Sequence, residues 1–234
     1  MRYPVAPSAP THATTFLQLQ SQDGLVERCV SAARDALYSG RKKVIPHMMT
    51  LLAALTFAPD GCRAAGLEQD VLFCELFPAL LGGANRRLQR PFRASDALVS
   101  AVALLLRNLA FSRVHLPLFV EKQLSMDVHA RGGALACTES IGVGALILMC
   151  CLSRCSAAAR PTATTVEIAT RVVDALRALC HANQKAVAVL RRSEALVRCL
   201  QSAADVLALC DGDAASGTAK GVAKLQHLFG HAEI

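Results

Sequence analysis

The sequence contains no tryptophan, and aromatic residues of all kinds make up only 4% of its 234 residues. It also lacks runs in which β-branched and polar residues alternate, which is the pattern of half-buried strands. Alanine and leucine, two strong helix formers, are abundant instead. We therefore predict an all-α fold, and the chain is long enough for one sizeable core or a short stack of helices.

No apolar run is long enough to cross a membrane, although 53% of the residues are hydrophobic and the mean hydropathy is +0.36. The longest nearly unbroken stretch, Ile141 to Leu152, is far shorter than the roughly 20 residues that a bilayer requires. Residues 1–20 also lack the continuous apolar core of a secretory signal peptide. We therefore expect a cytoplasmic protein without a transmembrane segment, whose excess apolar side chains belong to helices buried on more than one side.

Motifs that carry enzyme or metal chemistry are also missing. There is no Walker-type phosphate loop, no glycine fingerprint after a strand and no H-E-x-x-H. Cys150, Cys151 and Cys155 are spaced C-C-x-x-x-C, unlike the paired C-x-x-C of zinc sites, and carboxylates are sparse around them and around His181. We therefore expect no enzyme activity, no metal and no cofactor. We interpret the ten cysteines as reduced and mostly buried thiols.

Helical segments and helix breakers recur along the chain in one order: long helix, loop, long helix, tight turn, short helix. Residues 1–15, rich in Pro, Ala and Thr, are predicted to be disordered. Pro46 requires that its helix start there or kink, and Ser95 is a good N-cap. The predicted helices span about 16–37, 42–57, a short segment ending near 66, 68–81, 95–111, 116–124, 134–155, 164–181, 183–190, 193–210 and 220–229.

The turn between the second long helix and the short helix is also alike in sequence. Leu52–Phe57 aligns with Leu106–Phe111 and with Leu176–His181, at offsets of 54 and 70 residues. Variable loops explain the unequal offsets, because insertions in helical repeats fall in loops. The alternative is that any leucine-rich helix produces such matches by chance.

The run Leu104 to Ala110 resembles the third helix of an armadillo repeat, which carries a Leu-x-Asn-Leu-(Ala/Ser) core followed by a turn and a short helix. Residues 178–186 have the same layout, with Asn183-Gln184-Lys185 at the turn. The resemblance covers about residues 20–230. It implies an armadillo- or HEAT-like right-handed α-solenoid of about three to four irregular repeats, with residues 16–230 forming a single domain.

Two of these turns together also resemble the C-terminal region of the rotatin family, large armadillo-like proteins of centrioles and ciliary basal bodies. The matching residues are Leu-Arg-Asn-Leu-Ala-Phe at 106–111, and Ala178-Leu179 followed by Asn-Gln-Lys-Ala at 183–186. This resemblance implies a role in centriole, basal body or cilium assembly. It further implies cytoskeletal or centriolar protein partners and a location at the centrosome or basal body.

The armadillo resemblance places the second long helix of each cycle on the concave face. Arg107, Asn108 and Arg177 are therefore predicted partner contacts. In peptide-binding members of the family an equivalent Asn hydrogen-bonds the backbone of an extended ligand, but the aligned positions here are Ala54 and Ala178. The alternative is that Asn108 caps or bridges neighbouring turns locally.

The densest basic group comprises Arg86, Arg87, Arg90 and Arg93, with Phe92 among them. It is predicted to bind an acidic partner segment, a phosphopeptide or RNA, and the alternative is a solvated loop. The net charge is +7, but the other basic residues are scattered along the chain. We therefore expect a non-enzymatic scaffold that binds other proteins, in an oligomeric state that the sequence leaves open. The alternative is a basic helical domain that binds nucleic acid or an anionic membrane surface.

Overall fold

The computed structural model describes residues 24–81, 94–121, 142–156, 161–181 and 183–230. Within these ranges the chain forms eleven α-helices, one π-helical segment and one 3₁₀ turn, with no strand, so the all-α prediction is confirmed. Several predicted features lie outside the described residues: the disordered lead at 1–15, the helix starts at 16 and 134, and the loop that carries Arg86, Arg87, Arg90 and Arg93. The elements are α2 (Leu25–Tyr38), α3 (Ile45–Leu55), α4 (Pro59–Leu67), η1 (Val71–Leu76), α5 (Phe77–Leu80), α6 (Asp96–Phe111), η2 (Arg113–His115), α7 (Leu116–Val120), α8 (Val143–Ser156), α9 (Ala163–Cys180), α10 (Gln184–Arg191), α11 (Glu194–Leu207) and α12 (Asp213–Gly230).

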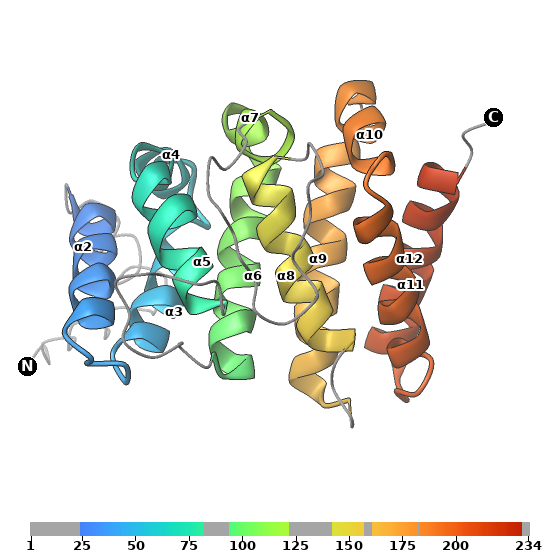
Figure 1. The fold of residues 1–234 in the computed structure, drawn as a ribbon, viewed down its shortest axis with the longest axis horizontal. Coiled ribbons are helices and arrows are strands. Elements are labelled where there is room, and N and C mark those ends of the chain that lie inside the picture. The colour runs from blue at the N-terminus through green and yellow to red at the C-terminus, as the bar shows by residue number, and fades with distance from the viewer. Residues whose placement is uncertain (1–23, 82–93, 122–141, 157–160, 182, 231–234) are drawn as a thin grey trace, which may run out of the picture.

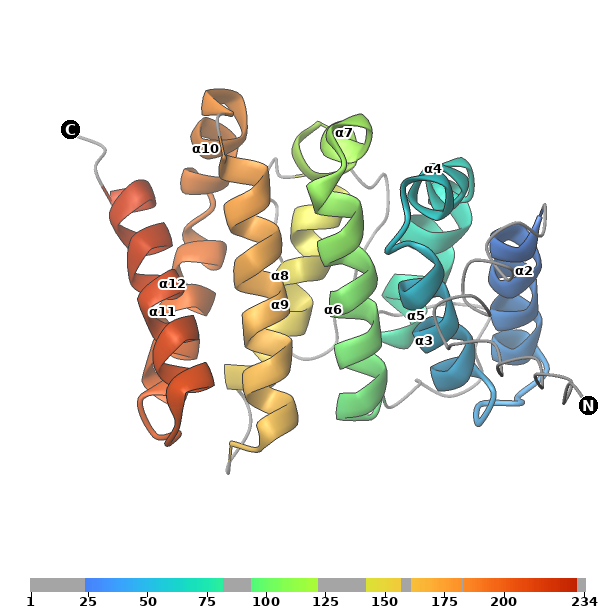
Figure 2. The same cartoon turned by 180° about the vertical axis from the view of Figure 1, so that it is seen from behind.

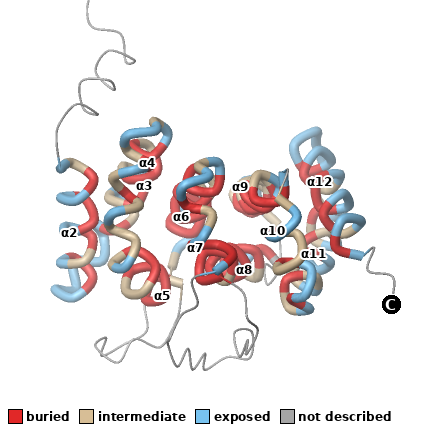
Figure 3. Tube along the Cα trace, turned by 90° about the horizontal axis from the view of Figure 1, so that it is seen from above, coloured by how far each residue is buried: buried red, intermediate tan, exposed pale blue. Residues whose placement is uncertain are grey.

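The helices form two rows with a cap of short helices along one edge. α3, α6, α9 and α12 lie side by side in chain order, each packed against the next (Figure 2). α5, α8 and α11 form the second row, and the backbone segments of buried residues, drawn in red, lie on the facing sides of the two rows (Figure 3). The short helices α4, α7 and α10 lie at the same edge of the molecule (Figure 1). Two long helices followed by a short one therefore recur along the chain, which is the order predicted from the sequence.

Helix starts are fixed locally by polar caps. The Ser95 hydroxyl accepts a hydrogen bond from the backbone N–H of Leu98 at 3.3 Å, as predicted. Asn183 and Ser193 cap α10 and α11 in the same way, and Thr162 and Thr165 form a reciprocal pair at the start of α9. Pro46 falls in the first turn of α3, where its missing N–H leaves no helical hydrogen bond unmade.

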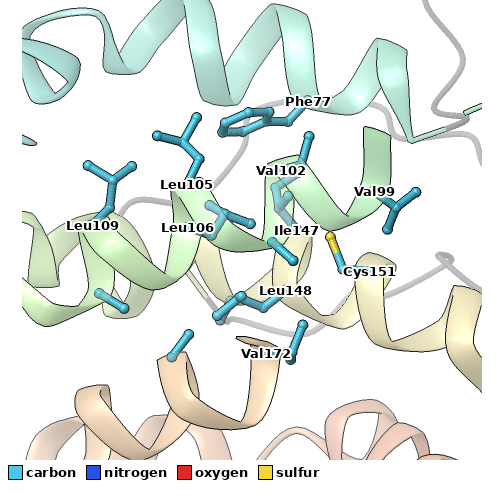
Figure 4. Close-up of a cluster of buried hydrophobic side chains, with 14 of the residues drawn as sticks. Phe77, Val99, Val102, Leu105, Leu106, Leu109, Ile147, Leu148, Cys151 and Val172 are labelled. Atoms are coloured by element: carbon cyan, nitrogen blue, oxygen red, sulfur yellow. The ribbon is translucent and has the colours of Figure 1, made fainter. Parts of the chain in front are cut away.

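The core runs between the rows, and α6 lies at its centre. Eleven of the sixteen residues of α6 are buried, and Leu105 and Leu106 pack among Phe77 of α5 and Leu148 of α8 (Figure 4). This burial on several sides explains the high hydropathy of the chain. Phe73 packs edge-on against Phe77, with ring centroids 5.1 Å apart.

Polar contacts set the register between α6 and α9. Ser100 donates a hydrogen bond to Glu167, and Arg107 donates one to Asp174. Both pairs join positions 67 residues apart, so the two helices meet in one constant register along their length. This register fixes how the ends of α6 and α9 face each other.

The last helix begins earlier than expected. The sequence predicted a loop followed by a helix from Lys220, but α12 starts at Asp213. Its small residues let it approach α9 closely: a Cβ on Gly221 would lie 2.7 Å from a methyl carbon of Val173. Glycine serves here for close helix packing rather than as a breaker.

Within the described residues, no single helix has the length and apolar composition to cross a bilayer. The helices α6 and η2–α7 meet that criterion only when they are taken together, and they are bent by 101° relative to each other.

Candidate interaction site at the helix turns

The candidate site lies where the first-row helices turn into the short helices. We call these turns the hinges: residues 56–58 after α3, residue 112 after α6, and residues 181 and 183 after α9. They lie at or directly after the carboxyl-terminal ends of the three stretches that align in sequence. Because α3, α6 and α9 lie side by side in that order, the hinges form a row along one edge of the fold (Figure 2).

A pocket of about 490 Å³ opens between the first and second hinges, and we call it the first hinge pocket. Its volume falls within the roughly 300–1,000 Å³ range of ligand-binding clefts. Its lining residues are Thr56, Phe57, Ala58, Pro59, Cys62, Arg63, Arg107, Asn108, Phe111, Ser112, Val114 and His115.

A second pocket, of about 610 Å³, opens between the second and third hinges. We call it the second hinge pocket, and Phe111 belongs to both. Its lining residues are Ala110, Phe111, Arg113, Leu116, Asp174, Arg177, Ala178, Leu179, His181 and Asn183. The two pockets therefore occupy equivalent places along the row and adjoin each other at the second hinge.

Large apolar side chains stand exposed at the first hinge pocket. Phe57 is 78% exposed, Phe111 60% and Val114 76%. Phe57 and Phe111 are aligned positions in the recurrent sequence, and His181, also exposed, is the third. Scattered exposed apolar residues are ordinary, but three around one pocket make it a candidate interaction surface.

The charges of the site are unevenly distributed. Arg107 donates a hydrogen bond to Asp174 at 3.1 Å, and its guanidinium lies over the Phe111 ring, 5.1 Å from the centroid. The guanidinium of Arg63 lies 3.8 Å from a carboxylate oxygen of Asp60, and both side chains are largely exposed. Arg113 and Arg177 are exposed, and neither forms an ion pair with any residue that the structure describes. The second hinge pocket thus carries uncompensated positive charge.

Asn108 is 8% exposed and is engaged within the fold. Its side-chain amide donates to the carbonyl oxygen of Ala53 at 2.8 Å and lies 3.3 Å from the Thr56 hydroxyl. It thereby ties the carboxyl-terminal end of α3 to α6. Both contacts join separate helices, so this is not the local cap or bridge drawn from the sequence, and they engage the N–H groups of the amide.

His115 lies at the back of the first hinge pocket and is 5% exposed. Its Nε2 lies 2.9 Å from the backbone oxygen of Cys62, a distance that fits an N–H donated to the carbonyl. Burial lowers the pKa of His115, and the hydrogen bond to Cys62 opposes that shift. The pocket is therefore backed by a neutral ring near pH 7.

The cysteine group of α8 has no feature of a reactive site. Cys151 and Cys155 are almost fully buried, and burial raises the pKa of the Cys155 thiol to about 12. A thiol with so high a pKa is a poor nucleophile at neutral pH. Among the residues that the structure describes, no three His, Cys, Asp or Glu side chains lie together in a metal-binding group.

The predicted site residues fall into three classes. Arg107 lines the first hinge pocket and donates to Asp174, which lines the second pocket together with Arg177, whereas Asn108 is buried between helices. Arg86, Arg87, Arg90 and Arg93 lie outside the described residues. Their roles as partner contacts stay predictions.

The sequence interpretation missed the exposed aromatic side chains of the hinges. Their signal was present, since Phe57 and Phe111 end aligned stretches directly before Ala58 and Ser112. An apolar residue in that place is usually taken for core, because helix periodicity does not show where a helix stops packing against its neighbours.

Comparison of the chain with known protein families, curated proteins and solved structures found no match in any of the three.

Proposed function

We propose that this chain is a non-enzymatic protein-interaction scaffold whose partner docks along the row of hinges. The observation that carries the proposal is the pair of adjoining hinge pockets, with Phe57 and Phe111 exposed beside them. Exposed aromatic side chains beside preformed pockets are typical anchors of protein interfaces, where their burial supplies much of the binding energy.

The proposal includes an armadillo- or HEAT-like right-handed solenoid of about three to four irregular repeats. Its support is the recurrent order of helices, with the short helices gathered at one edge (Figure 1). The shared register of α6 and α9 supports the same arrangement. In such stacks the side chains of one face can change without disturbing the core, which suits a binding surface.

Partner capture tests the proposal. The tagged double variant Phe57→Ser with Phe111→Ser should lose proteins that the unchanged chain retains from an extract of its own cells, identified by cross-linking and mass spectrometry. The thermal midpoint should shift little because both side chains are mostly exposed.

Leu209→Ser is the matched control, because Leu209 is 76% exposed and lies outside both pockets. It should retain the same proteins as the unchanged chain. Equal retention by the double variant would refute the docking surface, and a large loss of its stability would show that the two phenylalanines are structural.

The rotatin-family resemblance makes the centriole and basal body the first places to look for the partner. On that proposal the tagged chain concentrates at these structures, and the double variant loses the enrichment while the Leu209→Ser control keeps it. A uniform cytoplasmic distribution of the unchanged chain would contradict this part of the proposal alone.

A further inference from the structure

We infer that the two hinge pockets together bind one short acidic peptide segment of a partner protein. An apolar side chain of the peptide occupies the first pocket, and a carboxylate lies between Arg113 and Arg177 at the second. The inference rests on the proposed function and adds to it the chemical class of the partner.

The first pocket supplies the apolar part of the recognition. Phe57, Phe111 and Val114 are exposed around it, and Pro59 and Cys62 contribute further carbon and sulfur surface. A large aliphatic or aromatic side chain placed here removes these surfaces from water, which is the main favourable term in such contacts.

The second pocket supplies the electrostatic part. It contains one carboxylate, Asp174, which Arg107 already engages from the side of the first pocket. Arg113 and Arg177 then remain with no ion pair among the described residues. Two guanidinium groups without a compensating acid complement a carboxylate, to which arginine donates paired hydrogen bonds.

Phe111 makes the two pockets continuous, since it lines both. A peptide that crosses its ring therefore meets the apolar surface and the free arginines in succession. The stacking of Arg107 on Phe111 holds a guanidinium at the crossing point, where it is already matched by Asp174.

A peptide fits this surface better than a nucleic acid strand does. Nucleic acid binding requires cations along the whole path of the backbone phosphates. In the first pocket the arginines Arg63 and Arg107 each have a carboxylate neighbour, and His115 is neutral near pH 7. The unpaired positive charge is confined to one of the two pockets.

Selection from a displayed library of random dodecapeptides tests the inference on the full chain. The expected enriched sequences carry one or two large apolar residues close to Asp or Glu. Their binding is then measured by fluorescence polarisation with labelled synthetic peptides. Phe111→Ser should weaken them by about tenfold or more, as expected for a central aromatic anchor.

Charge reversal is the sharper arm of the test. The double variant Arg113→Glu with Arg177→Glu should bind the selected peptides about tenfold or more weakly. A fresh selection on this variant should enrich Lys and Arg in place of Asp and Glu. The control Arg191→Glu with Arg192→Glu changes the net charge equally at the far end of α10 and should alter affinity less than about twofold.

The outcomes separate the inference from the proposed function. Enriched peptides that depend on Phe111 but lack acidic residues, or that tolerate the charge reversal, overturn the inference and leave the docking function standing. If no enriched peptide depends on Phe111, both fail. Tighter binding of a labelled oligouridylate than of any peptide, with a steep salt dependence, overturns the inference in favour of nucleic acid.

Discussion

Asn108 shows how one polar side chain can hold two helices of such an array together. Its amide reaches the carbonyl oxygen of Ala53 and the Thr56 hydroxyl, both on the neighbouring helix end. These contacts bridge 55 and 52 residues of sequence, so local sequence patterns gave no sign of them. The sequence could name Asn108 as unusual, but its role follows only from the packing of α6 on α3.

Asn108→Ala is expected to destabilise the fold by about 1–3 kcal/mol, because it removes a buried donor from its acceptors. The free energy of unfolding, measured by urea denaturation, tests this. Ser202→Ala, an exposed change on α11, should lie within about 0.5 kcal/mol of the unchanged chain. An Asn108→Ala variant as stable as the control would contradict this structural role of the amide.

His115 should make stability depend on pH. Its folded-state pKa lies below the ordinary value of 6.5, so the unfolded chain takes up a proton first as the pH falls. The stabilising effect of the neutral ring is complete above pH 6.5 and is lost as the pH drops from there toward the folded-state pKa. The urea concentration at the unfolding midpoint should therefore decrease as the pH is lowered from about 7.5 to about 5.5.

His115→Gln should flatten that fall in the midpoint, even if it lowers stability at every pH. His47, an exposed histidine, provides the control, and His47→Gln should leave the pH dependence unchanged. The same dependence in both variants would assign the effect to other groups.

At the scale of elements, α12 separates two roles of glycine within one helix. A Cβ added at Gly217 meets no atom within 4 Å, whereas one added at Gly221 lies 2.7 Å from Val173. Valine is stiff about its first side-chain torsion and yields little. The two positions therefore form a matched pair.

Gly217→Ala should stabilise the chain by about 0.5–1 kcal/mol, because alanine favours a helix more than glycine does. Gly221→Ala should destabilise it by about 1–3 kcal/mol through overpacking. Thermal or urea denaturation of both variants gives the comparison. A neutral effect of Gly217→Ala would indicate that the helix starts near Lys220, as the sequence first suggested.

The start of a helix could be predicted where a polar side chain caps it, but not where close packing against another helix determines it. Ser95 stands directly before an apolar run, and its cap was predicted from that arrangement alone. The predicted start of α12 was wrong, because glycine and serine were taken as helix breakers. In the structure, packing against α9 outweighs their low helix propensity. The π-helical turn at Val71–Leu76 likewise has no local signal in the sequence.

At the scale of the whole molecule, six cysteines are buried in the described part of the chain and report on opening of the core. They are Cys29, Cys62, Cys150, Cys151, Cys155 and Cys180. Burial raises the pKa of Cys62 to about 11 and that of Cys180 to about 12.

These six thiols should resist iodoacetamide at pH 8 in the native chain and react readily in urea, because alkylation requires an accessible thiolate. Peptide mass spectrometry after timed pulses locates each modified residue. Rapid native labelling of Cys151, which is fully buried in the centre of α8, would contradict the packing of the two rows.

The fold class and the order of the helices could be predicted from the whole sequence, because composition and breaker spacing determine them. The hinge pockets could not, since they depend on how α3, α6 and α9 stand beside one another. Arg107 and Arg177 were selected from the sequence, yet the contact of Arg107 with Asp174, beside Arg177 in the second hinge pocket, required the register of α6 against α9.

Phe111, the wall common to both hinge pockets, has one further consequence. A ligand that displaces the ring in one pocket changes the wall of the other. A ligand that fixes the ring on one side changes the free energy of occupation on the other, and by thermodynamic linkage the effect is equal in both directions. Phe111 is thus the side chain through which a ligand in one hinge pocket can affect a ligand in the other.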